Sequence, residues 1–155
     1  MSTTQPAPGW YWVVSIIGLL WNLLGVLIFF WYTVFMEMMM TPEVLAAVPE
    51  AERAQMEQQM QMLAATPLWV NVAYGIAVFG GLLGCLLLLM KRKLAVPVFG
   101  LSLAGVVAQN VYGLGMAKSQ EILGATAFIV PSIVVVFGII LLMTAIKAKN
   151  EGWSR

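Results

Sequence analysis

Few side chains in this sequence can do chemistry, and the most distinctive are uncharged amides inside apolar segments. Asn22 follows Trp21 in the first apolar run, and Gln109 and Asn110 lie close to Tyr112 in the third. Amides form hydrogen bonds with hydroxyl and carbonyl groups, and an aromatic ring can stack on a ligand. These five residues are therefore candidates for a site that binds an uncharged solute. The structural alternative is a bond between helices, from Asn22 to Asn110 or Gln109.

Methionine is concentrated in residues 36–62, which hold seven of the eleven methionines in the chain. Thioether sulfur is a soft ligand that suits Cu(I), so Met36, Met38, Met39 and Met40 are candidate copper ligands. Methionine is also a flexible side chain that fills apolar interfaces, and the sequence has no His to complete a copper site. We therefore expect packing rather than metal binding, and we predict no resident metal or cofactor.

The residue types that most enzymes use for catalysis are missing from the apolar part of the sequence. Four long apolar runs contain no Lys, Arg, Asp, Glu or His, and the chain has no P-loop, GxSxG, CxxC or HExxH motif. We therefore predict that the protein is not an enzyme and has no catalytic residues. The formal net charge of +1 gives no indication of nucleic-acid binding.

The elements that must position these side chains are the apolar runs themselves. Hydrophobic residues make up 61% of the sequence and charged residues 10%, with a mean hydropathy of +0.91. A soluble domain has about 25% charged residues, and about 20 apolar residues span the hydrocarbon of a bilayer. The runs cover residues 10–35, 68–90, 94–116 and 125–146. Because backbone groups in lipid must bond internally, we predict an all-α, polytopic membrane protein.

We expect the four spans to form two antiparallel hairpins within a single membrane domain, residues 1–155. Lys91, Arg92 and Lys93 form the short connection between the second and third spans, and Lys147 and Lys149 follow the fourth. Basic residues mark cytoplasmic loops, so these positions predict that both termini are cytoplasmic. Six of the seven glutamates fall on the opposite side, which agrees with this orientation. The first span is predicted to be an uncleaved helix rather than a signal peptide.

Small residues recur at four-residue spacing in the second and third spans. Such rows let two helix backbones approach closely when the surrounding lipid is as apolar as the side chains. The row residues are Ala73, Ala77, Gly80, Gly81 and Gly84 in the second span and Gly100, Ala104 and Ala108 in the third. They are candidates for a helix-packing interface, either within the bundle or with a second copy or another membrane protein.

The segment between the first two spans, residues 36–67, is predicted to be helical and amphipathic. Thr41 is a candidate N-cap, with Pro42 at the first helical position, and Pro49 begins a second helix. Apolar residues gather on one face of this segment, which suits contact with a membrane surface or a partner. The candidate contact residues are Met36, Met38, Met39, Met40, Met56, Met60 and Leu63.

An internal repeat is a further hypothesis. Asn22-x-x-Gly25 in the first span corresponds to Asn110-x-x-Gly113 in the third, and the tripeptide Val-Phe-Gly occurs in both the second and the fourth. The chain could therefore consist of two similar hairpins, the first with an insertion. Parallel repeats of this kind occur in transporters, but they also arise from duplication of any hairpin.

Several segments distributed over nearly the whole chain carry a family resemblance. They are Trp10-Tyr11-Trp12, Leu20-Trp21-Asn22-x-x-Gly25, Pro67-x-Trp69, Ala77-Val78-Phe79-Gly80-Gly81, Lys91-Arg92-Lys93, Ala95-x-Pro97-x-Phe99, Ser102-Leu103 and Gly152-Trp153-Ser154-Arg155. Together they make the chain similar to small four-helix proteins of the bacterial inner membrane that are often labelled sugar transporters. The resemblance implies a multi-pass protein of the bacterial inner (cytoplasmic) membrane and sugar transport. It carries no substrate motif that can be transferred position by position.

These observations support three functional hypotheses. The first is a non-enzymatic accessory or interaction subunit of a larger membrane complex, which acts through helix packing. The alternative is a small transporter of a neutral, sugar-like solute that works as a homo-oligomer and has a cavity beside its amides. The third is copper handling by the methionine-rich segment. The expected partners are membrane lipid and another membrane protein or a second copy, not nucleic acid.

Overall fold

The computed structural model of the protein describes residues 5–39, 41–116 and 124–154. The described residues form helices and no strands. The elements are α1 (Gly9–Phe30), η1 (Trp31–Phe35), α2 (Met36–Met39), α3 (Pro42–Ala47), α4 (Glu50–Ala64), α5 (Leu68–Leu89), α6 (Ala95–Val111), η2 (Tyr112–Met116) and α8 (Thr126–Asn150). The two η elements are π-helical turns that continue α1 and α6 without a break. The predicted all-α class is confirmed.

Four helices are long and apolar enough to cross a membrane. They are Gly9–Phe35, Leu68–Leu89, Ala95–Gly115 and Ala127–Asn150. Their ends lie within a few residues of the predicted spans, because each apolar run ends at charged residues, at a proline or in a turn. The fourth helix extends past the predicted end at residue 146 and reaches Asn150.

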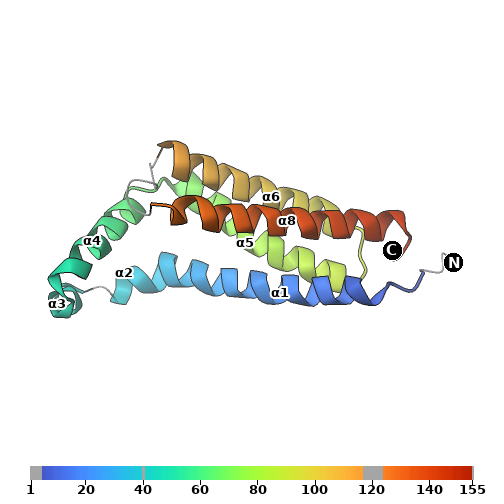
Figure 1. The fold of residues 1–155 in the computed structure, drawn as a ribbon, viewed down its shortest axis with the longest axis horizontal. Coiled ribbons are helices and arrows are strands. Elements are labelled where there is room, and N and C mark those ends of the chain that lie inside the picture. Colours follow the sequence, from blue (N-terminus) through green and yellow to red (C-terminus); the bar gives the residue numbers. More distant parts are fainter. Residues whose placement is uncertain (1–4, 40, 117–123, 155) are drawn as a thin grey trace.

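The four long helices lie side by side, with α5 in a central position (Figure 1). Helix α5 packs most extensively against α6 and next against α1, and α8 packs against α6. Both termini and the turn at residues 91–93 lie at one end of the bundle, here called the termini end (Figure 1). Helices α3 and α4, here called the arm, lie at the opposite end.

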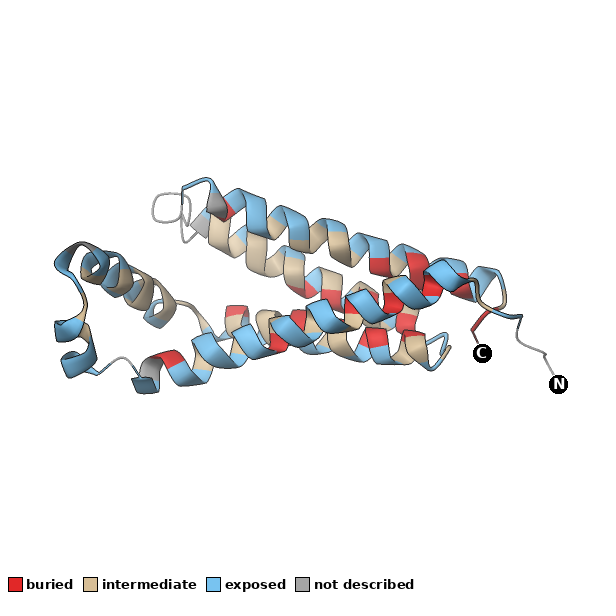
Figure 2. Cartoon of the chain, turned by 60° about the horizontal axis from the view of Figure 1, so that its bottom comes forward, coloured by how far each residue is buried: buried red, intermediate tan, exposed pale blue. Residues whose placement is uncertain are grey.

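The buried core of the bundle is concentrated near the termini end (Figure 2). Its members are Tyr11, Cys85, Leu88, Ala95, Phe99, Leu141, Ala145, Ala148 and Trp153. The hydroxyl of Tyr11 donates a hydrogen bond to the carbonyl oxygen of Leu88, and the Trp153 ring packs edge-on against Tyr11 with 5.9 Å between ring centroids. These contacts tie α1, α5 and the end of α8 together, so the helices converge here.

The close packing of α5 and α6 depends on glycine. A Cβ atom added at Gly105 would lie 2.7 Å from the carbonyl oxygen of Ala73, and one added at Gly84 would lie 2.7 Å from the Phe99 ring. Ser102 lies on the same face of α6 and donates a hydrogen bond of 2.6 Å to the carbonyl oxygen of Ala77. The face of α6 that contacts α5 therefore consists of Phe99, Ser102 and Gly105.

The predicted small-residue rows fall differently on the two helices. In α5, Ala77, Gly81 and Gly84 are buried, and Ala73 and Gly80 are half-buried. In α6, Ala104 is exposed, Ala108 is half-buried, and a Cβ atom added at Gly100 would meet no atom within 4 Å. The predicted row in α6 therefore does not lie on the face that packs against α5. A four-residue spacing defines a stripe along a helix, but it does not indicate whether that stripe faces inward.

Side-chain hydrogen bonds at both ends of α3 define the local structure of the arm. The Thr41 hydroxyl accepts a hydrogen bond of 3.4 Å from the backbone N–H of Val44, as an N-cap does. The guanidinium of Arg53 on α4 donates to the carbonyl oxygens of Ala46 (2.9 Å) and Val48 (3.1 Å) at the end of α3. These bonds join the two short helices at an elbow.

Candidate functional site

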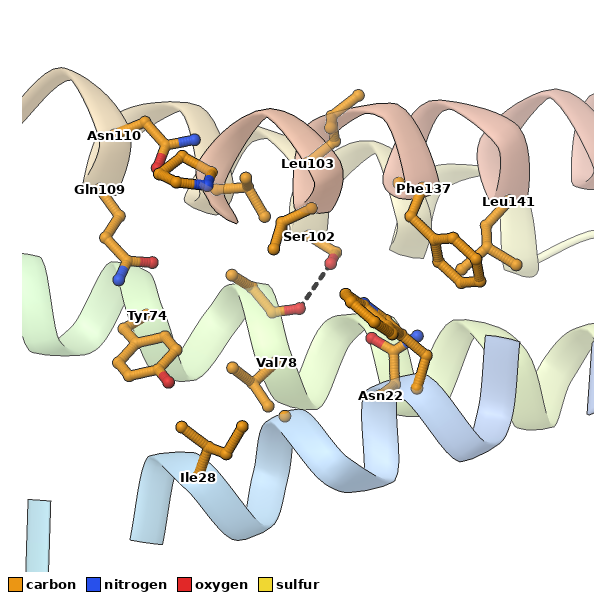
Figure 3. A pocket seen from close by; sticks show the side chains of 18 of the residues that line it. Asn22, Ile28, Tyr74, Val78, Ser102, Leu103, Gln109, Asn110, Phe137 and Leu141 are labelled. Atoms are coloured by element: carbon orange, nitrogen blue, oxygen red, sulfur yellow. Dashed lines mark hydrogen bonds between the residues drawn. The ribbon is translucent and has the colours of Figure 1, made fainter. Parts of the chain in front are cut away.

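A cavity of about 310 Å³ lies inside the bundle, between α1, α5, α6 and α8. Figure 3 shows side chains from these helices that point into it. Most of the lining is aliphatic or aromatic, and its polar side chains are Asn22, Tyr74, Ser102, Gln109 and Asn110. No charged side chain belongs to the described lining. The cavity is thus an apolar space with a few uncharged hydrogen-bonding groups.

Asn22 marks the end of this cavity nearer the bundle core. Its amide nitrogen donates to the carbonyl oxygen of Gly18 at 2.8 Å and lies 3.5 Å from the Cys85 sulfur. Its amide oxygen lies against Gly81, where a Cβ atom would overlap it. Within the described part of the chain this oxygen accepts no hydrogen bond. Asn22 therefore still has an acceptor to offer to a ligand.

Trp21 and Phe137 form a wall of the cavity between α1 and α8. The centroids of the two rings are 5.2 Å apart, and both residues line the cavity. The two ring planes are inclined by 36°, and Trp21 is 39% exposed. The position of Trp21 deep in α1 is thus explained by the cavity wall rather than by the end of the helix.

Gln109 and Asn110 mark the other end of the cavity, facing Tyr74 of α5 (Figure 3). None of these three side chains forms a hydrogen bond with another described residue. Gln109 and Asn110 are half-buried, so their amides keep access to water or to a ligand. Their polar atoms are the free donors and acceptors of the site.

A second cavity, of about 450 Å³, adjoins the first toward the arm. The two cavities share Tyr74, Gln109, Asn110, Val130 and Pro131, so these residues form a neck between them. On its far side the second cavity is lined by Gln59, Met62, Leu63 and Thr66, which belong to α4 and the turn after it. A hollow therefore runs from Asn22, past the neck, to the arm.

The residues predicted as a solute site are brought together in part. Trp21, Asn22, Gln109 and Asn110 line the first cavity, whereas Tyr112 lines the second. Asn22 is bonded to Gly18 and Cys85 rather than to Gln109 or Asn110 among the described residues. The Trp69 ring packs edge-on against Tyr112, with ring centroids 5.6 Å apart.

Sequence reasoning missed several polar residues of the hollow. Asn71 and Tyr74 of α5 and Gln59 of α4 line it, and none of them was a candidate. Asn71 carries the same signal that identified Asn22, an amide inside an apolar run. Nothing in the sequence distinguishes Tyr74 from a tyrosine at the end of a span.

The candidate copper ligands do not share one environment. Met36 is buried, whereas Met38 is 64% exposed and Met39 is 55% exposed. Met40 lies outside the described residues. Among the described parts of the chain, no group of three or more His, Cys, Asp or Glu side chains could hold a metal ion.

The other contact residues predicted on the arm, Met56, Met60 and Leu63, are half-buried on α4. Leu63 lines the second cavity, so part of this face of α4 is directed toward the hollow.

Comparisons with protein-family models, curated proteins and solved structures found no match to this chain.

Proposed function

We propose that this chain is a multi-pass membrane protein that binds an uncharged solute with hydroxyl or carbonyl groups inside its bundle and carries it across the bilayer. The observation that supports this proposal most strongly is the neck, where Gln109 and Asn110 are shared by two adjoining cavities. In this proposal the four long helices insert as two antiparallel hairpins, and a second copy completes the transport unit.

The lining of the hollow favours an uncharged ligand. A charged group at the centre of a bilayer costs about 2.5–3.5 kcal/mol even on the most lenient scale, and the described lining offers no opposite charge to offset that cost. Free amides can exchange hydrogen bonds with hydroxyl groups. The volume of about 310 Å³ lies at the lower end of the range of small-molecule pockets.

The shape of the hollow favours transport over simple binding. It extends toward the arm end, whereas the buried core around Tyr11, Cys85 and Leu88 fills the termini end. A transporter that works by alternating access is open at one end and closed at the other in each of its states, and its site lies near mid-membrane. The basic residues near the termini end support a cytoplasmic position for both termini, and the proposed location is the bacterial inner membrane.

A second candidate function is that of an accessory subunit, as the sequence first indicated. The observation in its favour is the arm, which lies beyond the ends of the long helices and leaves Met38 and Met39 largely exposed beside it (Figure 1). An exposed apolar segment of this kind suits contact with another membrane protein.

The transport proposal can be tested by solute flux into proteoliposomes that contain the purified chain. We expect at least one of glycerol, xylose, glucose and sucrose to enter faster than into empty liposomes. Asn110→Ala should lower this rate by about fivefold or more, because one hydrogen bond to the solute is lost. Ser132→Ala is the matched control, since Ser132 is an exposed polar residue of α8. Rates equal to those of empty liposomes for all four solutes would contradict transport of these compounds.

Water in the hollow can be tested independently of the solute. In a Cys85→Ala background, Val106→Cys places a thiol in the cavity lining, and Val107→Cys places one on a surface that is 48% exposed outside the bundle. Thiol reagents react with the thiolate, which needs water. A water-soluble reagent should label the variant at position 106 much faster than the variant at position 107. The opposite order indicates a dry bundle and moves the proposal to the accessory subunit.

The accessory proposal has its own measurement. Native mass spectrometry after mild extraction from the source membrane would show the chain in a larger complex at fixed stoichiometry. A monomer or homodimer alone would argue against an accessory role.

A further inference from the structure

Two lysines at the termini end lie over two tryptophans at the start of α1. The Nζ atom of Lys91 is 5.3 Å from the ring centroid of Trp12, and that of Lys147 is 5.2 Å from the ring centroid of Trp10. Both distances are within the range of a cation–π interaction. The two rings are 42% (Trp10) and 37% (Trp12) exposed, so a ligand can reach them and the lysines. We call these four residues the basic aromatic surface.

The backbone of Lys91 is in the left-handed conformation, with φ of 55°. Helix α5 ends in a Schellman motif, in which the N–H of Arg92 bonds to the carbonyl oxygen of Leu87 and that of Lys91 to the carbonyl oxygen of Leu88, both at 2.8 Å. Glycine is the usual residue at this position, because a side chain strains a left-handed backbone. Lys91 therefore occupies a position that disfavours lysine.

Helix α8 ends in the same motif with the usual residue. Gly152 has φ of 71° and bonds to the carbonyl oxygen of Lys149, and Trp153 bonds to that of Ala148 at 2.9 Å. The chain thus uses glycine at one of two equivalent helix ends and lysine at the other. Strain of this kind persists mostly where a residue serves a function, which directs attention to the ammonium group of Lys91.

The charge of the basic aromatic surface is not neutralised within the described residues. Neither Lys91 nor Lys147 forms an ion pair with a described carboxylate. The described basic residues near this end are Lys91, Arg92, Lys93, Lys147 and Lys149. Glu151 is the one acidic residue in the two described segments that carry them, residues 91–93 and 147–151. Such an excess of positive charge attracts an anion.

The surroundings identify the anion as a lipid headgroup. From Trp10 and Trp12, the exposed surface of α1 continues as apolar side chains, among them Val13, Ile16 and Ile17. A free anion gains nothing from this surface, whereas acyl chains can pack along it. Basic and aromatic side chains at the ends of apolar helices are also the groups that contact anionic lipid headgroups.

We propose that the basic aromatic surface binds the headgroup phosphates of anionic phospholipids, with Lys91 and Lys147 as the phosphate-binding cations. Trp10 and Trp12 hold the two ammonium groups at the start of α1, and the acyl chains lie along the apolar face of that helix. This proposal shares the membrane location of the proposed function but does not depend on the cavity or on solute transport.

The proposal can be tested with the full chain in nanodiscs of phosphatidylglycerol and phosphatidylcholine in equal amounts, by counting retained lipids in native mass spectrometry. We expect preferential retention of phosphatidylglycerol. Lys91→Gly should lower its apparent affinity about fivefold, because the phosphate loses the ammonium group that is held over Trp12. The same variant should melt at an equal or higher temperature, because glycine relieves the backbone strain. Lys91→Arg should bind like the unmodified chain.

Lys149→Ala is the matched control, because it removes one exposed positive charge from the same end without touching either tryptophan. Equal losses of affinity for phosphatidylglycerol in Lys91→Gly and Lys149→Ala would show that general charge attraction explains the binding, and would overturn the proposal. Displacement of the lipid by millimolar inorganic phosphate would also overturn it, since the site would then recognise free phosphate. The cavity variant Asn110→Ala should retain lipid normally, so failure of solute transport and failure of lipid binding can be told apart.

Discussion

At the scale of single residues, Asn22 shows how an uncharged polar group is accommodated among apolar helices. Its amide nitrogen is bonded to Gly18 and lies near the sulfur of Cys85, and its amide oxygen occupies the space left by the missing side chain of Gly81. The sequence identified Asn22 by type, because an amide in an apolar run is conspicuous. It did not identify the partners, because these depend on the rotation of each helix about its axis.

The space at Gly81 gives the first stability prediction. In Gly81→Ala the new Cβ atom would overlap the Asn22 oxygen, so the amide would have to move and the free energy of unfolding should fall by about 1–3 kcal/mol. Thermal unfolding in detergent measures this change.

Gly100→Ala is the matched control, because a Cβ atom at Gly100 meets no atom within 4 Å. Alanine is the better helix former, so this variant should be as stable as the unmodified chain or up to about 1 kcal/mol more stable. Equal destabilisation by both substitutions would show that Gly100 is also covered, for example by a second copy.

At the scale of elements, the bounds of the helices were predictable and their inward faces were not. Apolar runs of about 20 residues ended by charged residues, proline or turns define spans directly. In a soluble helix, polar residues then mark the outer face. Here both faces of α6 are apolar, so its sequence pattern does not show which face packs against α5. The predicted row lies on one stripe of the helix, and the observed packing face lies on another, formed by Phe99, Ser102 and Gly105. The cavity is a property of the helix arrangement and had no counterpart in the sequence beyond its amides.

The elbow between α3 and α4 gives a prediction at this scale. In Arg53→Ala, the carbonyl oxygens of Ala46 and Val48 lose their guanidinium donor, so the end of α3 should open more often. Hydrogen–deuterium exchange should become about tenfold faster at Leu45 and its neighbours in α3 and stay unchanged in α5. Glu52→Ala, which alters an exposed residue in the same turn, should exchange normally. Equal acceleration in both variants would assign the effect to α4 as a whole.

At the scale of the whole molecule, the bundle is asymmetric along its length. Its core is concentrated near the termini end (Figure 2), and the two cavities extend from Asn22 toward the arm. Phe99 and Leu141 belong to the core and also line the first cavity, so the two regions meet at these residues.

This division predicts that the core controls access to Cys85. The Cys85 side chain is 0% exposed, so a thiol reagent reaches it only when the core opens. Trp153→Ala removes the edge-on contacts with Trp10 and Tyr11 and should raise the labelling rate of Cys85 by at least about tenfold. Phe128→Ala, at an exposed position of α8, should leave the rate unchanged. If the Trp153 variant were labelled at the normal rate, the end of α8 would not belong to the core in solution.

The contact of Trp153 with Trp10 and Tyr11 also has a consequence for biosynthesis. Helix α1 is made before the segment after α8, yet the Trp153 ring that covers the start of α1 belongs to that later segment. Until that segment is made, Tyr11 and Trp10 lack their edge-on contacts with Trp153. A chain that stops before Trp153 should therefore leave the start of α1 uncovered, because this aromatic contact can form only after all four long helices have been made.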